Sequence, residues 1–328
     1  MLSQIFRKGK ENEIIENTPR QSSGSIQDRD MTKNTRLKII IISVAVLLAF
    51  ALCGVGIYIF RDSFIEEDIV ANTLEDGGIV LHFIDVGQAD CILIMTPQGN
   101  MLIDAGTNSS EAQLKSYLYE LEIESFEYLV LTHLHDDHIG GADMIVKEFD
   151  VENVIMTDSD EDIEIYLTLL SLIQDRDINV IEAVSGESFS LGDFKSTILA
   201  PNKEYEEYDE VNSTSVVLKC EFGECSVILT GDAETDSEAE MIERYGEFLD
   251  CDILKLGHHG SKTSSSYEFL EITSPDYAIA CCGTDNTYGH PAAEVVYRLN
   301  LFGIQLLRTD KEGSIVFICN GEKFEYVD

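Results

Sequence analysis

Hydrophobic and polar positions change period repeatedly along most of the chain, from the alternation of a strand to the spacing of a helix. Residues 79–84 and 91–96 alternate or run apolar on either side of a short turn, and residues 101–103 follow a second turn. Residues 111–121 carry apolar side chains at helical spacing, and residues 128–131 return to a buried strand. The pattern therefore predicts a three-stranded meander followed by a helix and a further strand.

The same alternation continues toward the C-terminus, without a short internal repeat. In chain order it predicts a helix at 140–149, a strand at 153–156, a helix at 163–176, strands at 189–191, 195–199, 215–220 and 226–230, a helix at 237–245, strands at 253–256 and 277–280, a helix at 292–301, and strands at 305–308 and 314–318. This succession predicts an α/β fold of two comparable halves. Each half contributes a sheet with its helices outside, and a site is expected where the strand ends of both halves meet.

Residues 39–60 form an apolar run of 22 residues without a charge, long enough to cross a hydrocarbon core of about 30 Å as a helix. A buried core helix would keep a polar stripe, and a cleaved signal peptide would end at a small-x-small site, and neither pattern is present. We therefore expect a transmembrane helix in contact with the lipid bilayer.

The flanking charges predict an orientation and a division of the chain. Residues 1–38 carry eight basic side chains, whereas the chain turns acidic beyond Arg61. We expect a disordered cytoplasmic tail at 1–38, the membrane span at 39–60, an acidic linker at 61–77 and a folded domain at 78–328. The protein would then be a single-pass protein of the cell membrane, with its folded domain extracellular.

Composition narrows the range of partners. The chain has 328 residues, with 22 Lys and Arg against 61 Asp and Glu, for a formal charge of -39. Its 44% of hydrophobic residues is enough to build a packed core, so the high charge does not indicate a disordered protein. So acidic a chain repels phosphate backbones at long range, which excludes general coating of nucleic acid. A polyanionic substrate would have to be held through metal.

The eight cysteines show no CxxC spacing, so a zinc finger is not supported. Most are expected to be small core residues. Cys220 and Cys225 flank a short turn and could pair across a hairpin, although core packing is the favoured interpretation for them too.

The segment LVLTHLHDDHIGG places three histidines within six residues, directly after an apolar strand and before a glycine pair that opens a helix. Imidazole nitrogens and carboxylate oxygens at this density suit borderline divalent metals. His133 and His135 can fold onto one ion, while Asp137 and His138 face a second. The plainer alternative is a solvated turn in which Asp136 caps the following helix.

Two later segments share this placement just past an apolar strand: SVILTGDAE, which carries Asp232, and DILKLGHHGS, which carries His258 and His259. A carboxylate that bridges two divalent ions would complete the pair of sites.

The segments LHFIDVGQAD, MLIDAG, THLHDDH, ILTGDAE, LKLGHHGS, and NTYGHP followed by RTDKEGSI together closely resemble the metallo-β-lactamase superfamily, and within it the ComEC-like hydrolase domain of competence proteins and its stand-alone relatives. The resemblance covers about residues 79–320. It implies an αββα sandwich with a site for two divalent metal ions, zinc or manganese, at one edge of the paired sheets.

The resemblance also implies roles for individual residues. His133 and His135 match ligands of the first metal, and Asp137 and His138 match ligands of the second. Asp232 matches the bridging ligand. His258 matches the last ligand, with His259 as its substitute.

Other positions match residues that support the ligands. Asp104 matches an aspartate that holds the metal loop by hydrogen bonds, although it could equally be a turn residue. Asn212 and His290 match positions expected to contact substrate or metal ligands. One departure is the absence of any histidine between Asn153 and Gly231, where lactamases and lactonases usually present another ligand. The first metal is therefore expected to be one ligand short, with Asn212 or water filling in and manganese favoured.

The implied chemistry is metal-assisted hydrolysis with a metal-bound hydroxide as nucleophile. Asp137 could orient it, and Lys262 or His290 could stabilise negative charge on the substrate, although Lys262 is equally well explained as a surface residue. The resemblance favours a phosphodiester substrate, with DNA as the leading candidate, and the negative charge of the chain leaves a short or flexible single strand as its possible form. The alternatives are another extracellular phosphodiester, an esterase or lactonase acting on a small molecule, and a non-catalytic, membrane-tethered accessory module of DNA uptake.

Overall fold

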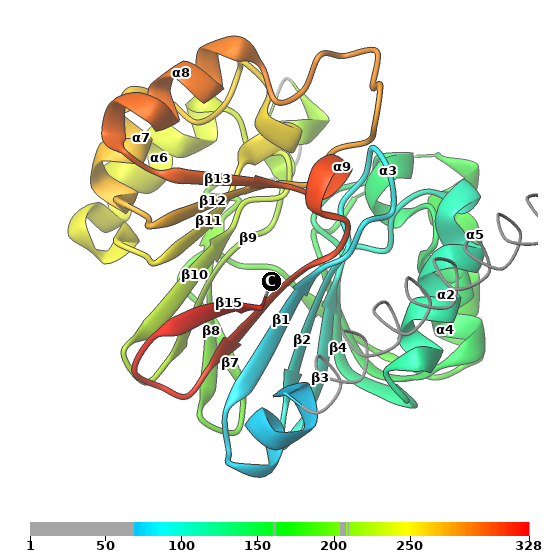
Figure 1. Ribbon diagram of the computed structural model, residues 1–328. Coiled ribbons are helices and arrows are strands. Elements are labelled where there is room, and N and C mark those ends of the chain that lie inside the picture. Colours follow the sequence, from blue (N-terminus) through cyan, green and yellow to red (C-terminus); the bar gives the residue numbers. More distant parts are fainter. Residues whose placement is uncertain (1–68, 160–161, 204–207, 209, 328) are drawn as a thin grey trace, which may run out of the picture. The chain divides into compact units, whose positions relative to one another are not determined.

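The computed structural model describes residues 69–159, 162–203, 208 and 210–327. They belong to a single unit, Ile65–Asp328. Within it two β-sheets pack face to face, and helices cover their outer faces (Figure 1).

The first sheet has eight strands in the order β15-β14-β1-β2-β3-β4-β5-β6. They are β1 (Ile79–Phe83), β2 (Ile92–Thr96), β3 (Gly99–Ile103), β4 (Ser125–Val130), β5 (Asp150–Met156), β6 (Asn179–Glu182), β14 (Ile315–Cys319) and β15 (Phe324–Val327). From β15 to β3 the neighbouring strands pair antiparallel. From β3 to β6 they pair parallel.

The second sheet has seven strands in the order β13-β12-β11-β10-β9-β8-β7. They are β7 (Ser188–Leu191), β8 (Phe194–Ala200), β9 (Val217–Phe222), β10 (Cys225–Leu229), β11 (Ile253–Lys255), β12 (Tyr277–Ala280) and β13 (Gln305–Arg308). Strands β7 to β10 pair antiparallel and strands β10 to β13 pair parallel, so both sheets are mixed.

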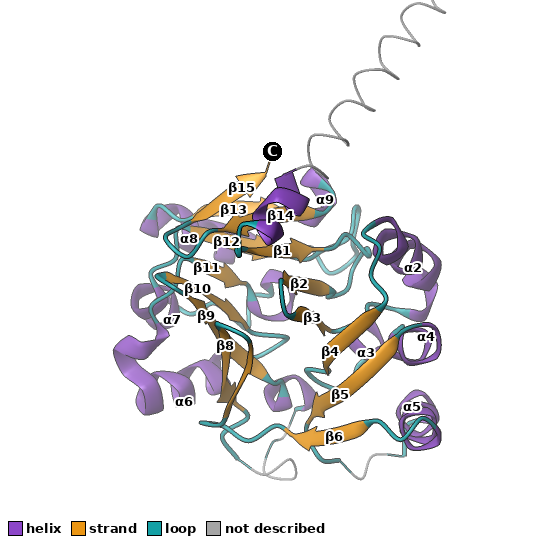
Figure 2. Ribbon diagram, turned by 90° about the horizontal axis from the view of Figure 1, so that it is seen from below, coloured by secondary structure: helices purple, strands orange, loops and turns teal. Residues whose placement is uncertain are grey.

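Helices form the outer layers of the sandwich (Figure 2). The first sheet carries α2 (Glu111–Glu120), α4 (Ala142–Glu148) and α5 (Glu164–Asp175), and the second carries α6 (Thr235–Tyr245), α7 (Tyr267–Thr273) and α8 (Ala293–Phe302). Two short α-helices, α3 (Asp136–Ile139) and α9 (Thr309–Glu312), follow strands β4 and β13. The expected αββα sandwich is therefore confirmed.

Strand β1 shows why the sequence forms these layers. Its side chains point alternately to the two faces of the sheet, as strand geometry requires. Ile79, Leu81 and Phe83 enter the core between the sheets, while Val80 enters the core beneath the helices. Because both faces are covered, the strand is apolar almost throughout instead of alternating with polar residues.

Some elements differ from those predicted. The helix expected at 140–149 is present as α4, and a one-turn helix that was not expected, α3, precedes it across Gly140 and Gly141. A Cβ at Gly140 would collide with the carbonyl oxygen of Asp136, and one at Gly141 with that of Ala105. The glycine pair thus allows the histidine loop to pack closely on the backbone that follows β3. Within the predicted linker, residues 69–75 are helical and Val70 is buried.

A disulfide links the two sheets through Cys225 of β10 and Cys319 of β14. It is not the pair considered from the sequence, because Cys220 is a free and buried thiol. The partners lie 94 residues apart in the chain, so only the packing of one sheet on the other brings them together.

The predicted cytoplasmic tail and transmembrane helix, residues 1–38 and 39–60, lie outside the described residues. Of the helices that the structure describes, none is long and apolar enough to cross a membrane. The longest described α-helix, α5, has 12 residues, and at about 1.5 Å per residue it reaches about 18 Å, short of a hydrocarbon core of about 30 Å. The structure therefore does not support the prediction of a single-pass membrane protein with bilayer contacts and an extracellular domain.

Candidate metal centre

The predicted ligands come from loops that follow β4, β10 and β11, and the supporting Asp104 comes from the loop that follows β3. Strands β3 and β4 are parallel neighbours in one sheet, and β10 and β11 are parallel neighbours in the other. The ends of parallel neighbours meet at one edge of a sheet, so the loops after them can share a site. This is the edge where the sequence places its acidic and histidine segments.

Asp104 holds the loop that carries His133, His135 and His138 in place through hydrogen bonds. Its carboxylate accepts hydrogen bonds from the backbone N–H of Thr132 at 2.8 Å and from the Thr132 hydroxyl at 2.7 Å. Its Oδ2 also lies 2.6 Å from Nδ1 of His138. Asp104 is fully buried and has a φ of 58°, a left-handed conformation that aspartate tolerates better than most residues. The hydrogen-bonding support expected of this residue is present.

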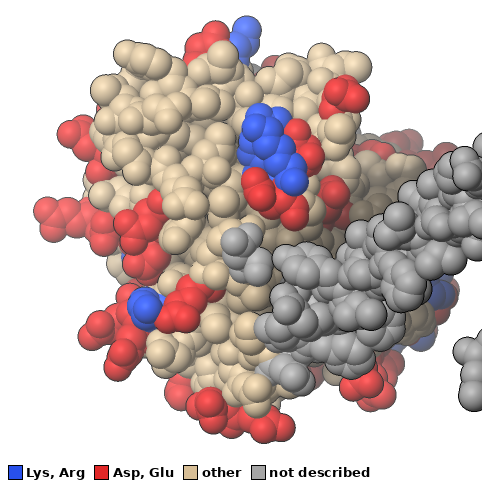
Figure 3. All heavy atoms as spheres, in the orientation of Figure 1, with Lys and Arg blue, Asp and Glu red and all other residues tan. Residues whose placement is uncertain are grey.

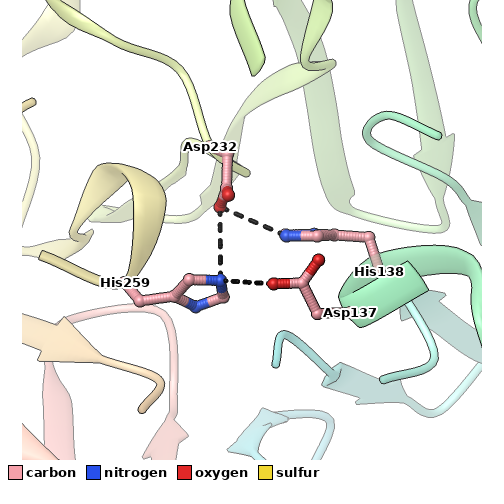
Figure 4. Close-up of side chains that lie close together, drawn as sticks. All are labelled: Asp137, His138, Asp232 and His259. Atoms are coloured by element: carbon pink, nitrogen blue, oxygen red, sulfur yellow. Dashed lines mark hydrogen bonds and ion pairs between the residues drawn. The ribbon is translucent and has the colours of Figure 1, made fainter. Parts of the chain in front are cut away.

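Four side chains come together above this support: Asp137, His138, Asp232 and His259 (Figure 4). Each offers a ligand atom within 4.8 Å of the others. Nε2 of His138 lies 3.2 Å from Oδ1 of Asp232, and Nε2 of His259 lies 3.2 Å from Oδ2 of Asp137. His138, Asp232 and His259 are buried, and Asp137 is partly exposed. Nitrogen and oxygen donors in this arrangement match a site for zinc or a similar divalent ion.

The rings of these two histidines are held by their other nitrogen. Nδ1 of His138 contacts Asp104, and Nδ1 of His259 contacts the carbonyl oxygen of Cys281 at 2.8 Å and Oδ1 of Asp90 at 3.2 Å. Metal-binding histidines usually donate this second N–H to a carboxylate or carbonyl, which fixes the ring and its tautomer. In both residues Nε2 is thereby directed at Asp232.

His133 and His135 lie toward the other oxygen of Asp232. Nε2 of His133 is 3.0 Å from Nδ1 of His135 and 3.9 Å from Oδ2 of Asp232. Nδ1 of His133 is within 3.4 Å of the Ser215 hydroxyl, so its ring too is held from behind. Asp232 therefore lies between two groups of histidines, with one carboxylate oxygen toward each.

His258 and His259 are adjacent but face different parts of the site. Both have left-handed backbones, with φ of 48° and 55°. His259 belongs to the four-residue cluster, whereas Nε2 of His258 lies 3.7 Å from Oδ2 of Asp232, the oxygen that His133 also approaches. Nδ1 of His258 lies 3.0 Å from Oε1 of Glu234. The structure thus places His259 with Asp137 and His138. It places His258 on the side of His133, where a further histidine ligand was expected to be missing.

A buried ion pair that the sequence analysis missed lies behind the cluster. The Lys255 ammonium pairs with Asp90, donates to the carbonyl oxygen of Gly231 at 2.6 Å and lies 3.8 Å from Oδ1 of Asp232. Both members of the pair are about 1% exposed or less. The available signal was a lysine within the apolar run DILKL, where a buried charge requires a partner.

The neighbouring charges lower the pKa of the carboxyl group of Asp232 and raise the pKa values of His138 and His259. Burial alone would raise the pKa of Asp232, but the charges of His138 and His259 outweigh it and hold that pKa well below its usual range. Burial opposes a charge on His259, yet Asp232 and Asp90 raise its pKa to about 9. The pKa of His138 is raised likewise by Asp232 and Asp104 against burial. Burial, together with His138, lowers the pKa of His133 well below its usual value. Carboxylates this deeply buried require positive charge beside them.

The remaining predicted residues lie around the cluster. His290 is half-buried, and burial together with His258 and His259 lowers its pKa to about 4, so its imidazole is neutral at pH 7. Asn212 donates to Oε1 of Glu234 at 3.2 Å, beside His258. Lys262 is exposed in the loop before α7. Glu234, which the sequence analysis did not single out, therefore connects Asn212 to His258.

Comparison with known proteins matches residues 84–284 to the metallo-β-lactamase superfamily model. ComE operon protein 3 of Bacillus subtilis (strain 168) is 31% identical over 255 residues, which cover 72% of this chain and 32% of that protein. Competence protein ComA of Neisseria gonorrhoeae is 32% identical over 234 residues, 71% of this chain and 31% of that protein. The chain thus spans about a third of the length of these relatives.

Among solved structures, the metallo-β-lactamase fold protein YhfI from Bacillus subtilis aligns over 74% of this chain and 100% of its own, with a TM-score of 0.49 and 13% sequence identity. The family model covers more than half of the chain. The chain therefore belongs to the metallo-β-lactamase superfamily and is a metallohydrolase of that fold.

Proposed function

We propose that this chain is a metal-dependent phosphodiesterase and that its leading substrate is single-stranded DNA. The observation that carries the proposal is Asp232, a buried carboxylate with histidines directed at both of its oxygens. The similarity to competence protein ComA supports a substrate related to DNA.

The residues present fit two divalent ions. Among the described residues, Nε2 of His138 and Oδ1 of Asp232 are buried and make ion-pair contacts but no further hydrogen bond, as expected of atoms that would bind a cation. We assign one ion to the cluster of Asp137, His138, Asp232 and His259.

The second ion would lie at the other oxygen of Asp232, between His133 and His135, with His258 in place of the histidine that the sequence lacks. Nitrogen donors prevail on this side and suit zinc. The carboxylate oxygens of Asp137 and Asp232 on the opposite side suit manganese equally well.

Divalent ions at such a site would activate water at neutral pH and stabilise charge on a phosphoryl group. The chain's own residues supply positioning. Asp137 is held by His259 through Oδ2, which leaves its second oxygen to orient a water molecule and accept its proton. His290 is neutral at pH 7 and can donate one hydrogen bond to a phosphoryl oxygen. Lys262, exposed four residues after His258 in the chain, can contact a phosphate farther along the strand.

Surface charge limits the form of the substrate. On the face seen in Figure 3, acidic side chains are scattered over the surface and basic ones are few. A long duplex that lay across such a surface would be repelled, because duplex binding depends on many phosphate contacts with Lys and Arg. A short or flexible single strand needs only to bring one phosphodiester to the metals.

The test is hydrolysis by the full chain, loaded with zinc or with manganese, of a single-stranded oligodeoxynucleotide, of bis-p-nitrophenyl phosphate and of a lactone. Asp232→Ala should abolish turnover, whereas Asp193→Ala, at an exposed position in the β7–β8 turn, should not. Turnover of the lactone alone would contradict the phosphodiesterase and favour the esterase alternative.

A further inference from the structure

Tyr288 stands out among the aromatic side chains near the metal centre because it is 73% exposed. Its ring stacks on His290, with centroids 5.6 Å apart and planes inclined by 26°. A ring that is stacked on one side and exposed on the other can accept a second flat group by offset stacking.

A row of rings connects Tyr288 to the predicted metal ligands. His290 lies 5.5 Å from His258 and 6.4 Å from His259, measured between ring centroids. Tyr288 is therefore the outermost member of a series of rings that begins at the metal centre and ends in solvent. A flat group placed against its free face would lie near a phosphate held at the metals.

The loop that carries Tyr288 is fixed by a side chain of its own. The Asn286 amide donates to the carbonyl oxygens of Gly283 at 3.0 Å and of His290 at 2.8 Å. Its carbonyl oxygen accepts from the backbone N–H of His290 at 2.9 Å. The ring of Tyr288 is thus presented from a short segment closed on itself, which lowers the entropy lost when a ligand binds.

Charge on the rest of the molecule favours a neutral contact of this kind. With a formal charge of -39, the chain has few cations to offer a phosphate backbone outside the metal centre. Proteins that bind single strands combine backbone contacts with bases stacked on aromatic rings, and the stacking does not depend on phosphate charge.

We propose that Tyr288 is a stacking residue for a nucleobase of single-stranded nucleic acid, beside the phosphodiester that is cleaved. The inference rests on the proposed function, since it names the part of the substrate that this site recognises. Stacking of the bases contributes to the affinity, whereas the phosphate backbone of the nucleic acid gains little from an acidic protein surface.

The first test compares two single-stranded oligodeoxynucleotides of equal length, one with its bases and one abasic throughout, as substrates of the full metal-loaded chain. Tyr288→Ala should raise the KM for the base-containing strand about tenfold, as expected for the loss of one stacked base. It should change the KM for the abasic strand by less than about twofold. Tyr288→Phe, which keeps the ring, should restore the wild-type KM.

Tyr297 provides a matched control, because it is 63% exposed and lies on α8. Tyr297→Ala should leave both KM values unchanged. Equal effects of Tyr288→Ala on the two strands, or no effect on either, would overturn the inference.

A second measurement separates this inference from the proposed activity. The chain contains no tryptophan, so Tyr288→Trp introduces a single reporter. Its fluorescence should be quenched by the base-containing oligonucleotide and unaffected by the abasic one. Quenching without hydrolysis would refute the phosphodiesterase and leave the stacking residue standing. Hydrolysis of the strand without quenching would refute the stacking residue alone.

Discussion

Replacement of Lys255 by methionine should destabilise the protein strongly. The substitution keeps the length of the side chain but removes the ammonium that pairs with Asp90 and donates to Gly231. Asp90 would then remain as a carboxylate at 1% exposure, with His259 beside it at 3.2 Å and His138 at 3.9 Å.

The magnitude follows from the burial of both partners. Removal of one member of a buried ion pair typically costs about 3–5 kcal/mol, because it leaves the other charge without compensation. His259 offsets part of this cost, so we expect a loss near the lower end, about 3 kcal/mol. Asp90→Asn should cost a similar amount, since it leaves the Lys255 charge without its nearest carboxylate. The double variant should lose less than the sum of the single ones, with a coupling free energy of at least about 2 kcal/mol.

The assay is urea unfolding of the full chain in the presence of EDTA, followed by circular dichroism. Lys219→Met is a matched control, because Lys219 is also buried but donates to the carbonyl oxygens of Phe248 and Asp250. It should cost about 1–3 kcal/mol and show no coupling to Asp90. A loss below about 1 kcal/mol for Lys255→Met, or strict additivity with Asp90→Asn, would refute the reasoning.

Three further predictions concern the metal centre and the disulfide. His259→Ala and His258→Ala should each lower the affinity for a different ion by at least about 100-fold in a cobalt(II) titration. Loss of the same ion from both variants would contradict the assignment of one ion to each oxygen of Asp232. In the metal-free chain, the raised pKa of His259, about 9 against an unfolded value of 6.5, should add stability that is complete below about pH 6.5 and lost as pH rises through 9. That change amounts to about 3 kcal/mol. Urea unfolding should therefore show a larger loss of stability over this pH range in the wild type than in His259→Gln, in which the raised pKa of His138 remains. Cys225→Ser should lower the free energy of unfolding by about 2–4 kcal/mol under oxidising conditions and have little effect in a reductant, because it removes the link to Cys319.

Much of the fold could be predicted from the sequence, because both faces of the central strands are buried and the periodicity of the chain is correspondingly clear. Strand β1 illustrates this, with five residues that are all buried. The one-turn helix α3 before α4 was not foreseen, because the link between them depends on the close approach of Gly140 and Gly141 to a distant turn. The pairing of Cys225 with Cys319 likewise depends on how one sheet lies on the other.

The candidate site was anticipated in part. The dense cluster of His133, His135 and His138 indicated metal chemistry directly. The different orientations of His258 and His259 could not be anticipated from the sequence. They depend on two consecutive residues in the left-handed conformation, which direct the two side chains to different oxygens of Asp232.

The pair formed by Asp90 and Lys255 escaped the sequence analysis for a related reason. Asp90 lies in the turn before β2 and Lys255 is the last residue of β11, and charged side chains are usually solvated at such positions. Only the packing of the two sheets shows that both are buried and in contact. The predicted membrane localisation rested on residues 39–60, and the described helices give it no support.

The most direct test of the account is the metal content of the full chain, measured by inductively coupled plasma mass spectrometry after dialysis against zinc or manganese. Because Asp232 presents one oxygen to each group of histidines, the wild type should retain two ions per chain and Asp232→Ala should lose both. Asp193→Ala should retain both ions. A wild type without bound metal, or an Asp232→Ala variant with its full complement, would contradict the account.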